Sequence, residues 1–331
     1  MSEYFNSLAT RRLRRVCSKL NIFSSNNIST STIEYDNTWA NLTGENFQMY
    51  LIKKIQSGQP FMVTRFGSGV LGTAIDYRLQ LSTKTFLKYI FGAIDSLDLQ
   101  RHNIYNLCNY DGFYPPNHDE IMRYGCLIYN TLTEIDAFAT IMKQERFFAN
   151  ELSNKVRCKF RDLEPFHHDT PWTSVLEGKK VLVIHPFVNT IEYQYKYNRE
   201  KIFQNKKCLP EFDLKLLRAV QNITISNDPY DQYNTWFDAY NFMCSKIDNI
   251  EFDIAILGCG AYGMPLAAYI KRMGKQSIHI GGSLQYLFGI RSKRAEEENP
   301  EVASFYNDAW VRPFDEDRPD GYKKIEDGCY W

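Results

Sequence analysis

The feature that most constrains the fold is an apolar run that ends in a glycine-rich turn and leads into a helical pattern. It lies at residues 253–274, DIAILGCGAYGMPLAAYIKRMG, where an apolar run at 254–257 precedes three glycines. Similar runs alternate with helical patterns through the C-terminal half. Strands separated by helices of this length predict an α/β fold, a Rossmann-like parallel sheet with helices on both faces. The mostly helical pattern of residues 84–160 predicts a helical insertion.

The chain divides into three predicted parts. Residues 1–40 form a basic N-terminal segment and a polar linker. Residues 41–170 form an N-terminal α/β half, which contains a predicted strand at 61–65 and the helical insertion. Residues 171–331 form the Rossmann-like C-terminal half. Strands are predicted in this last part at 180–184, 214–224, 253–257 and 277–280.

Composition and charge exclude several classes of protein. Lys+Arg and Asp+Glu balance at 39 each, so no global field attracts nucleic acid, and we expect none as a partner. The eight cysteines are scattered without a C-x-x-C pair, which is typical of reduced thiols and not of a zinc site. No apolar run approaches the ~18 residues of a membrane-spanning helix, and the N-terminus lacks the apolar core of a signal peptide. We therefore expect a cytoplasmic protein.

The N-terminal segment combines basic and apolar residues in a helical spacing. Four arginines stand together at positions 11, 12, 14 and 15. The apolar residues that accompany them are Phe5, Leu8, Leu13, Val16, Leu20 and Phe23. Three interpretations stay open: a helix on a membrane surface, a helix docked on the protein itself, or a mobile tail.

Parallel sheets bind their ligands at the carboxyl ends of the strands, and this rule selects the candidate site. The segments that follow predicted strands are 65–69, 185–189, 258–263 and 281–283. The pattern G-x-G-x-x-G at 258–263 permits a tight turn and close backbone approach to an anion, but it is weak evidence by itself.

A dinucleotide is not the ligand that we expect at this glycine pattern. An NAD site needs a carboxylate at the end of the next strand, and here that strand is followed by Gly281 and Gly282. A methyltransferase would usually place an acid two residues before the first glycine, where this chain has Ile256.

Two neighbouring glycine turns predict an anion site instead. The turn Gly281-Gly282-Ser283 follows its strand as the 258–263 turn does, and two adjacent helix N-termini can bind a diphosphate through backbone N–H groups. Arg291, with Lys293 and Arg294, lies shortly downstream and could neutralise it. The alternative is that the glycines only permit close helix–strand packing and that these basic side chains are solvated. The candidate substrate-binding residues are Gly67, Ser68, Gly258, Gly260, Gly263, Gly281, Gly282, Ser283 and Arg291.

The stretch FMVTRFGSGVLGTAIDY, residues 61–77, resembles the N-terminal signature of the GT-D class of nucleotide-sugar glycosyltransferases. Residues 176–187, 253–282 and the tail GCYW at 328–331 resemble the later half of members encoded among bacterial polysaccharide genes. The resemblance spans about residues 45–331. It implies transfer of a sugar from a nucleoside-diphosphate sugar to a glycan or polysaccharide acceptor, with Arg65 and Gly67 facing the ligand.

In that class an Asp-x-Glu pair follows Arg-Phe-Gly and holds a divalent cation, so the resemblance implies Mn²⁺ or Mg²⁺. This chain has Ser68-Gly69-Val70 there, and the metal ligands stay unassigned. Either basic residues neutralise the diphosphate without metal, or Asp76 and other acids are ligands, or activity is weak. A non-catalytic nucleotide-sugar-binding protein of the same fold is therefore the alternative, and an NAD(P)-dependent oxidoreductase is a third.

The candidate catalytic residues are Arg65, His185 and Glu192. Arg65 ends a predicted strand and would contact phosphate, unless it forms a buried ion pair. His185 also follows a strand. Ser68 would donate to phosphate or cap the next helix. Glu192 is a candidate base for the acceptor hydroxyl, but its spacing from Asn189 equally suits a capping box; Asp76 and Asp111 are further candidates.

Overall fold

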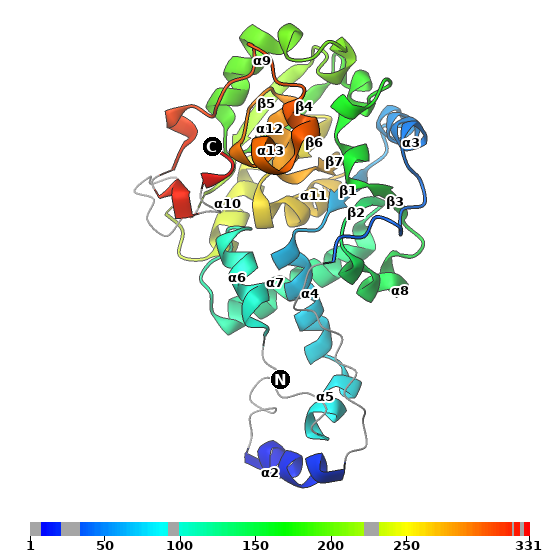
Figure 1. Cartoon of the computed structure of the whole chain (residues 1–331), viewed down its shortest axis with the longest axis vertical. Helices are drawn as coiled ribbons and strands as arrows, with labels where there is room; N and C mark the ends of the chain where they lie inside the picture. The colour runs from blue at the N-terminus through cyan, green and yellow to red at the C-terminus, as the bar shows by residue number, and fades with distance from the viewer. Residues whose placement is uncertain (1–7, 21–33, 92–98, 222–231, 320, 325–327) are drawn as a thin grey trace.

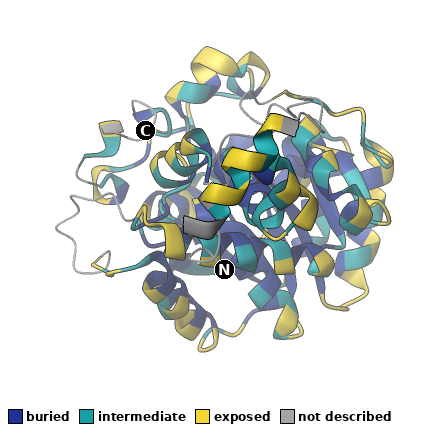
Figure 2. Ribbon diagram, turned by 90° about the horizontal axis from the view of Figure 1, so that it is seen from below, coloured by how far each residue is buried: buried dark blue, intermediate teal, exposed yellow. Residues whose placement is uncertain are grey.

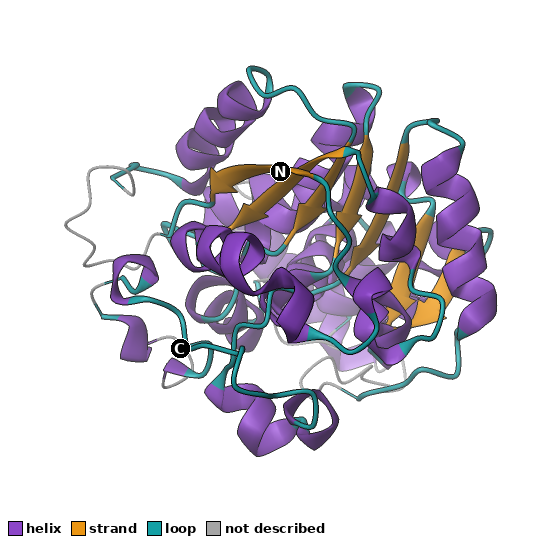
Figure 3. Ribbon diagram, turned by 90° about the horizontal axis from the view of Figure 1, so that it is seen from above, coloured by secondary structure: helices purple, strands orange, loops and turns teal. Residues whose placement is uncertain are grey.

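The computed structural model describes residues 8–20, 34–91, 99–221, 232–319, 321–324 and 328–331. Within these ranges the chain forms a seven-stranded sheet and a set of surrounding helices (Figures 1 and 3). The strands are β1 (Phe61–Arg65), β2 (Ala137–Thr140), β3 (Val156–Lys159), β4 (Lys180–His185), β5 (Asp213–Arg218), β6 (Ile254–Leu257) and β7 (Gln276–His279). The longer helices are α2 (Leu8–Cys17), α3 (Glu45–Gln56), α4 (Ser68–Gln80), α5 (Thr83–Ile90), α6 (Arg101–Asn109), α7 (His118–Thr131), α9 (Val188–Ile202), α10 (Trp236–Ile247) and α11 (Gly263–Arg272). The shorter helices are α8 (Ala149–Leu152), α12 (Leu284–Leu287), α13 (Lys293–Glu298) and α14 (Pro300–Ala303).

The sheet has the order β3-β2-β1-β7-β6-β4-β5, and every pairing in it is parallel. The predicted Rossmann-like α/β fold is therefore confirmed. The register places Val63 of β1 opposite Ala137 of β2 on one side and Ile278 of β7 on the other. Strands from both predicted halves thus share one sheet, and the division of the chain at residue 170 stays a prediction.

Each face of the sheet is covered by its own apolar cluster. Met62 and Leu182 point to the face covered by helices α4, α7, α10 and α11, and their neighbours Val63 and Val183 point to the face covered by α3 and α9. Successive residues of a strand alternate between faces, and a sheet buried on both faces needs apolar residues at every position. The strand sequences VLVI and IAIL meet that requirement.

Two strands were missing from the sequence-based interpretation, which gave residues 84–160 a mostly helical pattern. β2, AFAT, and β3, VRCK, show no apolar alternation, and neither is a continuous run of large apolar residues like IAIL of the equally short β6. The predicted helical insertion is present as α5, α6 and α7 between β1 and β2. β5 ends at Arg218, earlier than predicted, and residues 222–224 of that prediction lie outside the described residues.

The basic N-terminal segment forms α2, which contacts α5. The Arg14 Nε donates to the Tyr89 carbonyl at 3.1 Å, and its guanidinium lies 4.4 Å from the centre of the Tyr89 ring. Phe5 and Phe23 of the predicted apolar stripe lie outside the described residues. None of the helices in the described ranges combines the length and apolarity needed to cross a bilayer.

Candidate functional site

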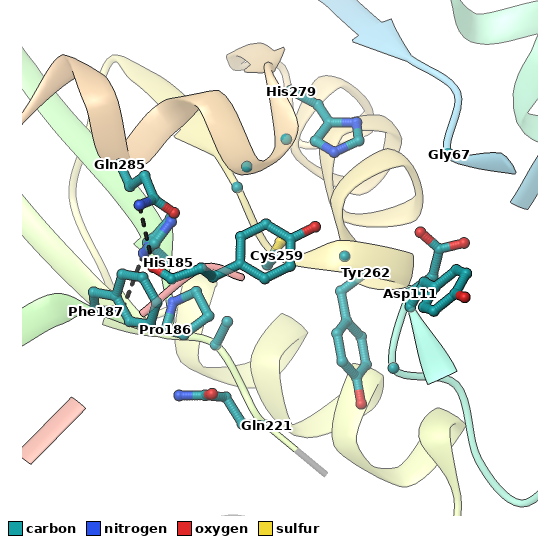
Figure 4. Close-up of a pocket in the computed structure, with 18 of the residues that line it drawn as sticks. Gly67, Asp111, His185, Pro186, Phe187, Gln221, Cys259, Tyr262, His279 and Gln285 are labelled. Carbon is teal, nitrogen blue, oxygen red and sulfur yellow. Dashed lines mark hydrogen bonds between the residues drawn. The ribbon is translucent and has the colours of Figure 1, made fainter. Parts of the chain in front are cut away.

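A cavity of about 160 Å³ lies where the loops after five strands of the sheet converge. Its walls come from the segments that follow β1, β4, β5, β6 and β7, together with the loop after α6 and the tail residues Tyr330 and Trp331 (Figure 4). In parallel sheets this is the edge at which ligands bind, because the carboxyl ends of all strands meet there. The cavity is thus the candidate site, at the edge that the sequence selected.

Arg65, the last residue of β1, is the single Lys or Arg among the described residues that line the cavity. Its Nη2 donates to the Phe66 carbonyl at 2.9 Å, and its guanidinium lies 5.4 Å from the centre of the Phe160 ring. Among the described residues the guanidinium has no carboxylate within ion-pair distance, although its charge acts on the buried Glu145, and its buried Nε has no hydrogen-bond partner there. A buried ion pair, the alternative left open for Arg65, is therefore absent from this part of the chain. The unpartnered donor leaves capacity for an anionic ligand.

The two predicted glycine turns lie next to each other at the cavity. A Cβ added to Gly258 would come within 2.6 Å of the Gly281 carbonyl oxygen, so the turns touch through their backbones. Gly281 has φ +69°, and a Cβ there would meet Arg65 Nη1 at 2.7 Å. Gly281 is therefore required twice, for its left-handed backbone and for the close approach of the guanidinium.

Asp111 is the single carboxylate among the described residues that line the cavity, and it lies between the β1 and β6 turns. A Cβ on Gly67 would meet Asp111 Oδ1 at 2.7 Å, and one on Gly260 would meet the Asp111 carbonyl oxygen at 2.5 Å. That carbonyl also accepts a 2.7 Å hydrogen bond from the Ala261 N–H. Figure 4 shows the carboxylate directed toward Gly67. Backbone packing thus holds Asp111 in place, although the sequence ranked it only as a further candidate.

Two buried histidines at the cavity are uncharged near neutral pH. Burial lowers the pKa of His185 to about 3, and burial with the nearby Arg65 charge lowers the pKa of His279 to about 3. His185 Nδ1 accepts a 3.0 Å hydrogen bond from the Phe187 N–H, which places the ring proton on Nε2. His279 Nδ1 pairs with the Thr64 hydroxyl at 3.0 Å. His185 carries its proton on Nε2, from which it can donate to a ligand, whereas His279 Nε2 packs against Gly263, and neither ring contributes positive charge.

The N-terminus of α9 follows β4 but is already occupied by a carboxylate of the chain. Asp317 accepts from the backbone N–H groups of Asn189 and Thr190 at 3.2 and 2.7 Å, and from both side chains. The helix begins after Phe187, so Asn189 lies inside it and the capping box proposed for Asn189 and Glu192 is wrong. Glu192 is exposed on α9 and does not line the cavity.

Several predicted site residues lie outside the cavity wall. Ser283 donates to Glu164 Oε1 at 2.6 Å behind the turn, and Arg291 pairs with Glu296 at 3.5 Å and lies over the Tyr306 ring. Ser68 begins α4, and Gly263 begins α11 behind His279. The predicted residues that do line it are Arg65, Gly67, His185, Gly258, Gly260, Gly281 and Gly282. Their chemical roles stay predictions.

The basic cluster downstream of Gly281 does not neutralise the cavity. Lys293 and Arg294 pair with Glu297 and Glu298 at 3.7 and 3.6 Å, one helical turn along α13. The sequence contains these partners four residues on, which is the spacing of helical ion pairs.

The sequence-based selection missed an aromatic wall. Phe187, Tyr110, Tyr262, Tyr330 and Trp331 line the cavity, and Trp331 lies 5.6 Å from Phe187 between ring centres. His279 was also missed, although it ends β7 and the strand-end rule could have selected it. Two hydrogen bonds from residues distant in sequence hold Tyr330 at the cavity. Its carbonyl accepts a hydrogen bond from Gln285 Nε2 at 3.4 Å, and its hydroxyl accepts one from Arg294 Nη1 at 2.9 Å.

The residues at the cavity do not fit a protein-built metal site. No three potential His, Cys, Asp or Glu ligands gather anywhere in the described ranges. Asp76 does not line the cavity. Its carboxylate is directed elsewhere and accepts hydrogen bonds from the Gln100 N–H and from Asn103 Nδ2, both at 3.0 Å. Burial raises the pKa of Asp76 to about 6. Asp111 is one carboxylate, whereas the Asp-x-Glu pair of the resembled class supplies two.

Comparisons with known proteins add little to this geometry. No family model and no curated protein matches the chain. A solved structure described as the highly conserved domain of unknown function 1792, with a distinct glycosyltransferase fold, matches with a TM-score of 0.38 and 13% identity over 86% of this chain and 93% of that chain. A likeness this distant assigns neither a family nor a function to the chain.

Proposed function

We propose that this chain is a glycosyltransferase that transfers a sugar from a nucleoside-diphosphate sugar to a glycan or polysaccharide acceptor. The observation that carries the proposal is Arg65, without a carboxylate partner in the described ranges, held against the Gly281 turn in the cavity at the carboxyl edge of the sheet. A guanidinium and backbone amides are the groups that bind a diphosphate. The sugar-transfer chemistry rests on the resemblance of residues 61–77.

The diphosphate would bind between Arg65 and the Gly281 turn. α4 is 13 residues long, but the Asp111 carboxylate already lies against its start. Asp111 Oδ1 and Oδ2 are 2.7 and 2.5 Å from the positions that a Cβ would take on Gly67 and Gly69, so the positive end of this helix faces a carboxylate of the chain. α12 contributes little of this kind because it is only four residues long, so the Gly281 turn would act through individual backbone N–H groups.

The nucleoside would lie against the aromatic wall. Phe187 and Trp331 form an edge-to-face pair there, and their rings give a base an apolar surface on which to stack. Gln285 also lines the cavity, and its Nε2 is already engaged by the carbonyls of Ile290, Arg291 and Tyr330, so it would hold the tail aromatics in place.

Transfer breaks the bond between the sugar C1 and the diphosphate oxygen, and that oxygen keeps the electron pair. The acceptor hydroxyl oxygen forms the new bond to C1 and loses its proton. Arg65 would stabilise the charge that develops on the diphosphate, and the neutral His185 Nε2–H would donate to a sugar or phosphate oxygen. Asp111 is the one carboxylate of the described wall, so we assign it the role of base for the acceptor hydroxyl.

A non-catalytic nucleotide-sugar-binding protein is the second candidate. The observation that favours it is the single carboxylate at the described wall of the cavity, where the resembled class has an Asp-x-Glu pair. In that case Arg65 and the glycine turns would bind the diphosphate as above, and Asp111 would only hold the turns together.

Turnover measurements separate the two candidates. The chain is incubated with UDP-, GDP- and dTDP-sugars, with and without Mn²⁺, and hydrolysis or transfer is recorded. We expect turnover with one class of donor, and a decrease of about 10²- to 10⁴-fold in Asp111→Asn with donor binding retained. Glu192→Gln, an exposed carboxyl outside the cavity, is the matched control and should leave the rate unchanged. Binding without turnover under every condition favours the second candidate, and a loss of rate in Glu192→Gln alone contradicts the assignment of Asp111.

A further inference from the structure

Helices α2 and α5 lie together at one end of the molecule, away from the sheet (Figure 1). α4 begins beside the cavity at Gly67, and its far end leads through Leu81 and Ser82 into α5. α2 is held on α5 by Arg14, which is bonded to the Tyr89 carbonyl and stacked on its ring. We use the name appendage for these two helices together with the 3-10 turn after α2 and the last turn of α4, which are residues 8–20 and 77–91.

The appendage carries a concentrated positive charge in a chain that is neutral overall. It contains eight Lys or Arg residues and no Asp or Glu, whereas the whole chain has 39 of each kind. The remainder of the sequence therefore has an excess of eight acids, and the charge of the molecule is polarised toward this end. The basic residues are Arg11, Arg12, Arg14, Arg15, Lys19, Arg78, Lys84 and Lys88.

Aliphatic side chains are exposed among these cations. Leu13 and Val16 of α2 are 50% and 67% exposed, and Leu81 and Leu87 beside or on α5 are 40% and 41% exposed. Arg12, which precedes Leu13, and Arg15, which lies between Leu13 and Val16, are also exposed on α2. Figure 2 looks onto this end of the molecule and shows exposed residues along α2. In an α-helix Arg12, Arg15 and Val16 lie on one face, opposite the Arg14 that contacts α5, and Lys19 follows in the 3-10 turn Ser18–Leu20.

Exposed cations together with exposed aliphatic side chains favour an anionic lipid surface as the partner of the appendage. Phosphate headgroups would pair with the cations, and leucine and valine would enter the boundary between headgroups and acyl chains. A nucleic acid would use the cations but would gain nothing from the four exposed aliphatic side chains, and a second copy would bring eight like charges against eight. We propose that the appendage docks this protein on bilayers that contain anionic phospholipids. This proposal is independent of the chemistry assigned to the cavity.

Vesicle flotation of the full chain tests the proposal. Vesicles of phosphatidylcholine alone are compared with vesicles that contain phosphatidylglycerol, at 50 mM and 500 mM salt. We expect binding only to the anionic vesicles, with a large loss at high salt because exposed charges are then screened. Arg12→Ala/Arg15→Ala should weaken binding at least tenfold, since each basic residue near such a surface contributes about fivefold. Leu13→Asn/Val16→Asn should also weaken it at unchanged charge.

The matched control is Lys53→Ala/Lys201→Ala, which removes two exposed lysines from the body of the protein. It should bind as the unaltered chain does. Circular dichroism and unfolding temperatures verify that the variants fold, and the salt comparison requires no variant. The proposal is overturned by failure to bind anionic vesicles, by equal binding to neutral vesicles, or by an equal loss in the lysine control. Binding that persists in Leu13→Asn/Val16→Asn while a single-stranded oligonucleotide competes fully would identify a polyanion site instead.

Discussion

Gly281, in the turn after β7, lies directly against the guanidinium of Arg65 at the end of β1. Its φ of +69° is a conformation that side chains rarely adopt, and a Cβ there would press on Arg65 Nη1. Because that atom is the far end of a flexible side chain, the fold can relax by moving the guanidinium. A substitution should therefore affect ligand binding more than stability.

Gly281→Ala and Gly274→Ala form a pair that isolates this effect. Gly274 also has a positive φ, +82°, but nothing lies within 4 Å of its Cβ position. Both variants should lose about 1 kcal/mol of unfolding free energy from backbone strain. Only Gly281→Ala should lose affinity for UDP, by tenfold or more, in titration calorimetry. Equal affinities in the two variants would contradict the contact between Gly281 and Arg65 as a binding feature.

The buried histidines give the protein a pH dependence that can be assigned to a residue. The pKa of His279 in the folded chain is about 3, below its ordinary value of 6.5, so folding favours the neutral ring. This contribution to stability is complete above pH 6.5 and is lost as the pH falls. Between pH 7 and pH 5 the unaltered chain should lose about 2 kcal/mol more unfolding free energy than His279→Gln. Denaturant unfolding at the two pH values measures the difference, and parallel pH profiles would show that His279 is not held neutral.

Residues at strand ends could be selected from the sequence, but the direction of their side chains could not. Arg65 and His185 line the cavity as the strand-end rule suggests. Ser283 follows the same rule and points away, because its hydroxyl donates to Glu164, which lies 119 residues earlier in the chain. No pattern in the sequence around Ser283 indicates that its hydroxyl binds a residue so distant in the chain.

At the scale of elements, the C-terminal tail fixes the start of α9. Asp317 is buried and accepts four hydrogen bonds from Asn189 and Thr190, so it caps a helix that begins about 130 residues earlier. Asp317→Ala should therefore cost about 2 kcal/mol of unfolding free energy. Asp315→Ala, which alters an exposed carboxyl two residues away, should change it by less than about 0.5 kcal/mol. Chemical unfolding compares the two, and similar losses would argue against the cap.

The elements that the sequence predicted well are those with long, regular patterns. The predicted strands at 61–65 and 180–184 differ from the structure by no more than one residue at either end, and the helical pattern after the 258–263 turn forms α11. β2 (AFAT) and β3 (VRCK) were missed because neither is a continuous run of large apolar residues such as IAIL of β6, which also has four residues, and both take their pairing from neighbouring strands. Their position in the sheet comes from tertiary contacts, which override weak local preference.

At the scale of the molecule, the order of strands brings the site together. β1 pairs with β7, so the Arg65 turn from early in the chain meets the Gly281 turn from late in it. The alternation of strands and helices predicts a parallel sheet, but it does not determine this order. The glycine turns after β6 and β7 could be proposed as neighbours because consecutive strands often lie side by side. Asp111 and the tail aromatics follow no strand, so the sequence could not place them at the same site.

In the proposed function Arg65 and the glycine turns bind the diphosphate of a nucleotide, and titration calorimetry with UDP measures this binding directly. The unaltered chain should bind UDP, and Arg65→Ala should weaken binding by about 10- to 100-fold, because a hydrogen bond to a charged group contributes about 1.5 to 3 kcal/mol. Arg291→Ala, which removes an arginine outside the cavity, should leave the affinity within about twofold. An Arg65→Ala protein that binds UDP as tightly as the unaltered chain would contradict the account.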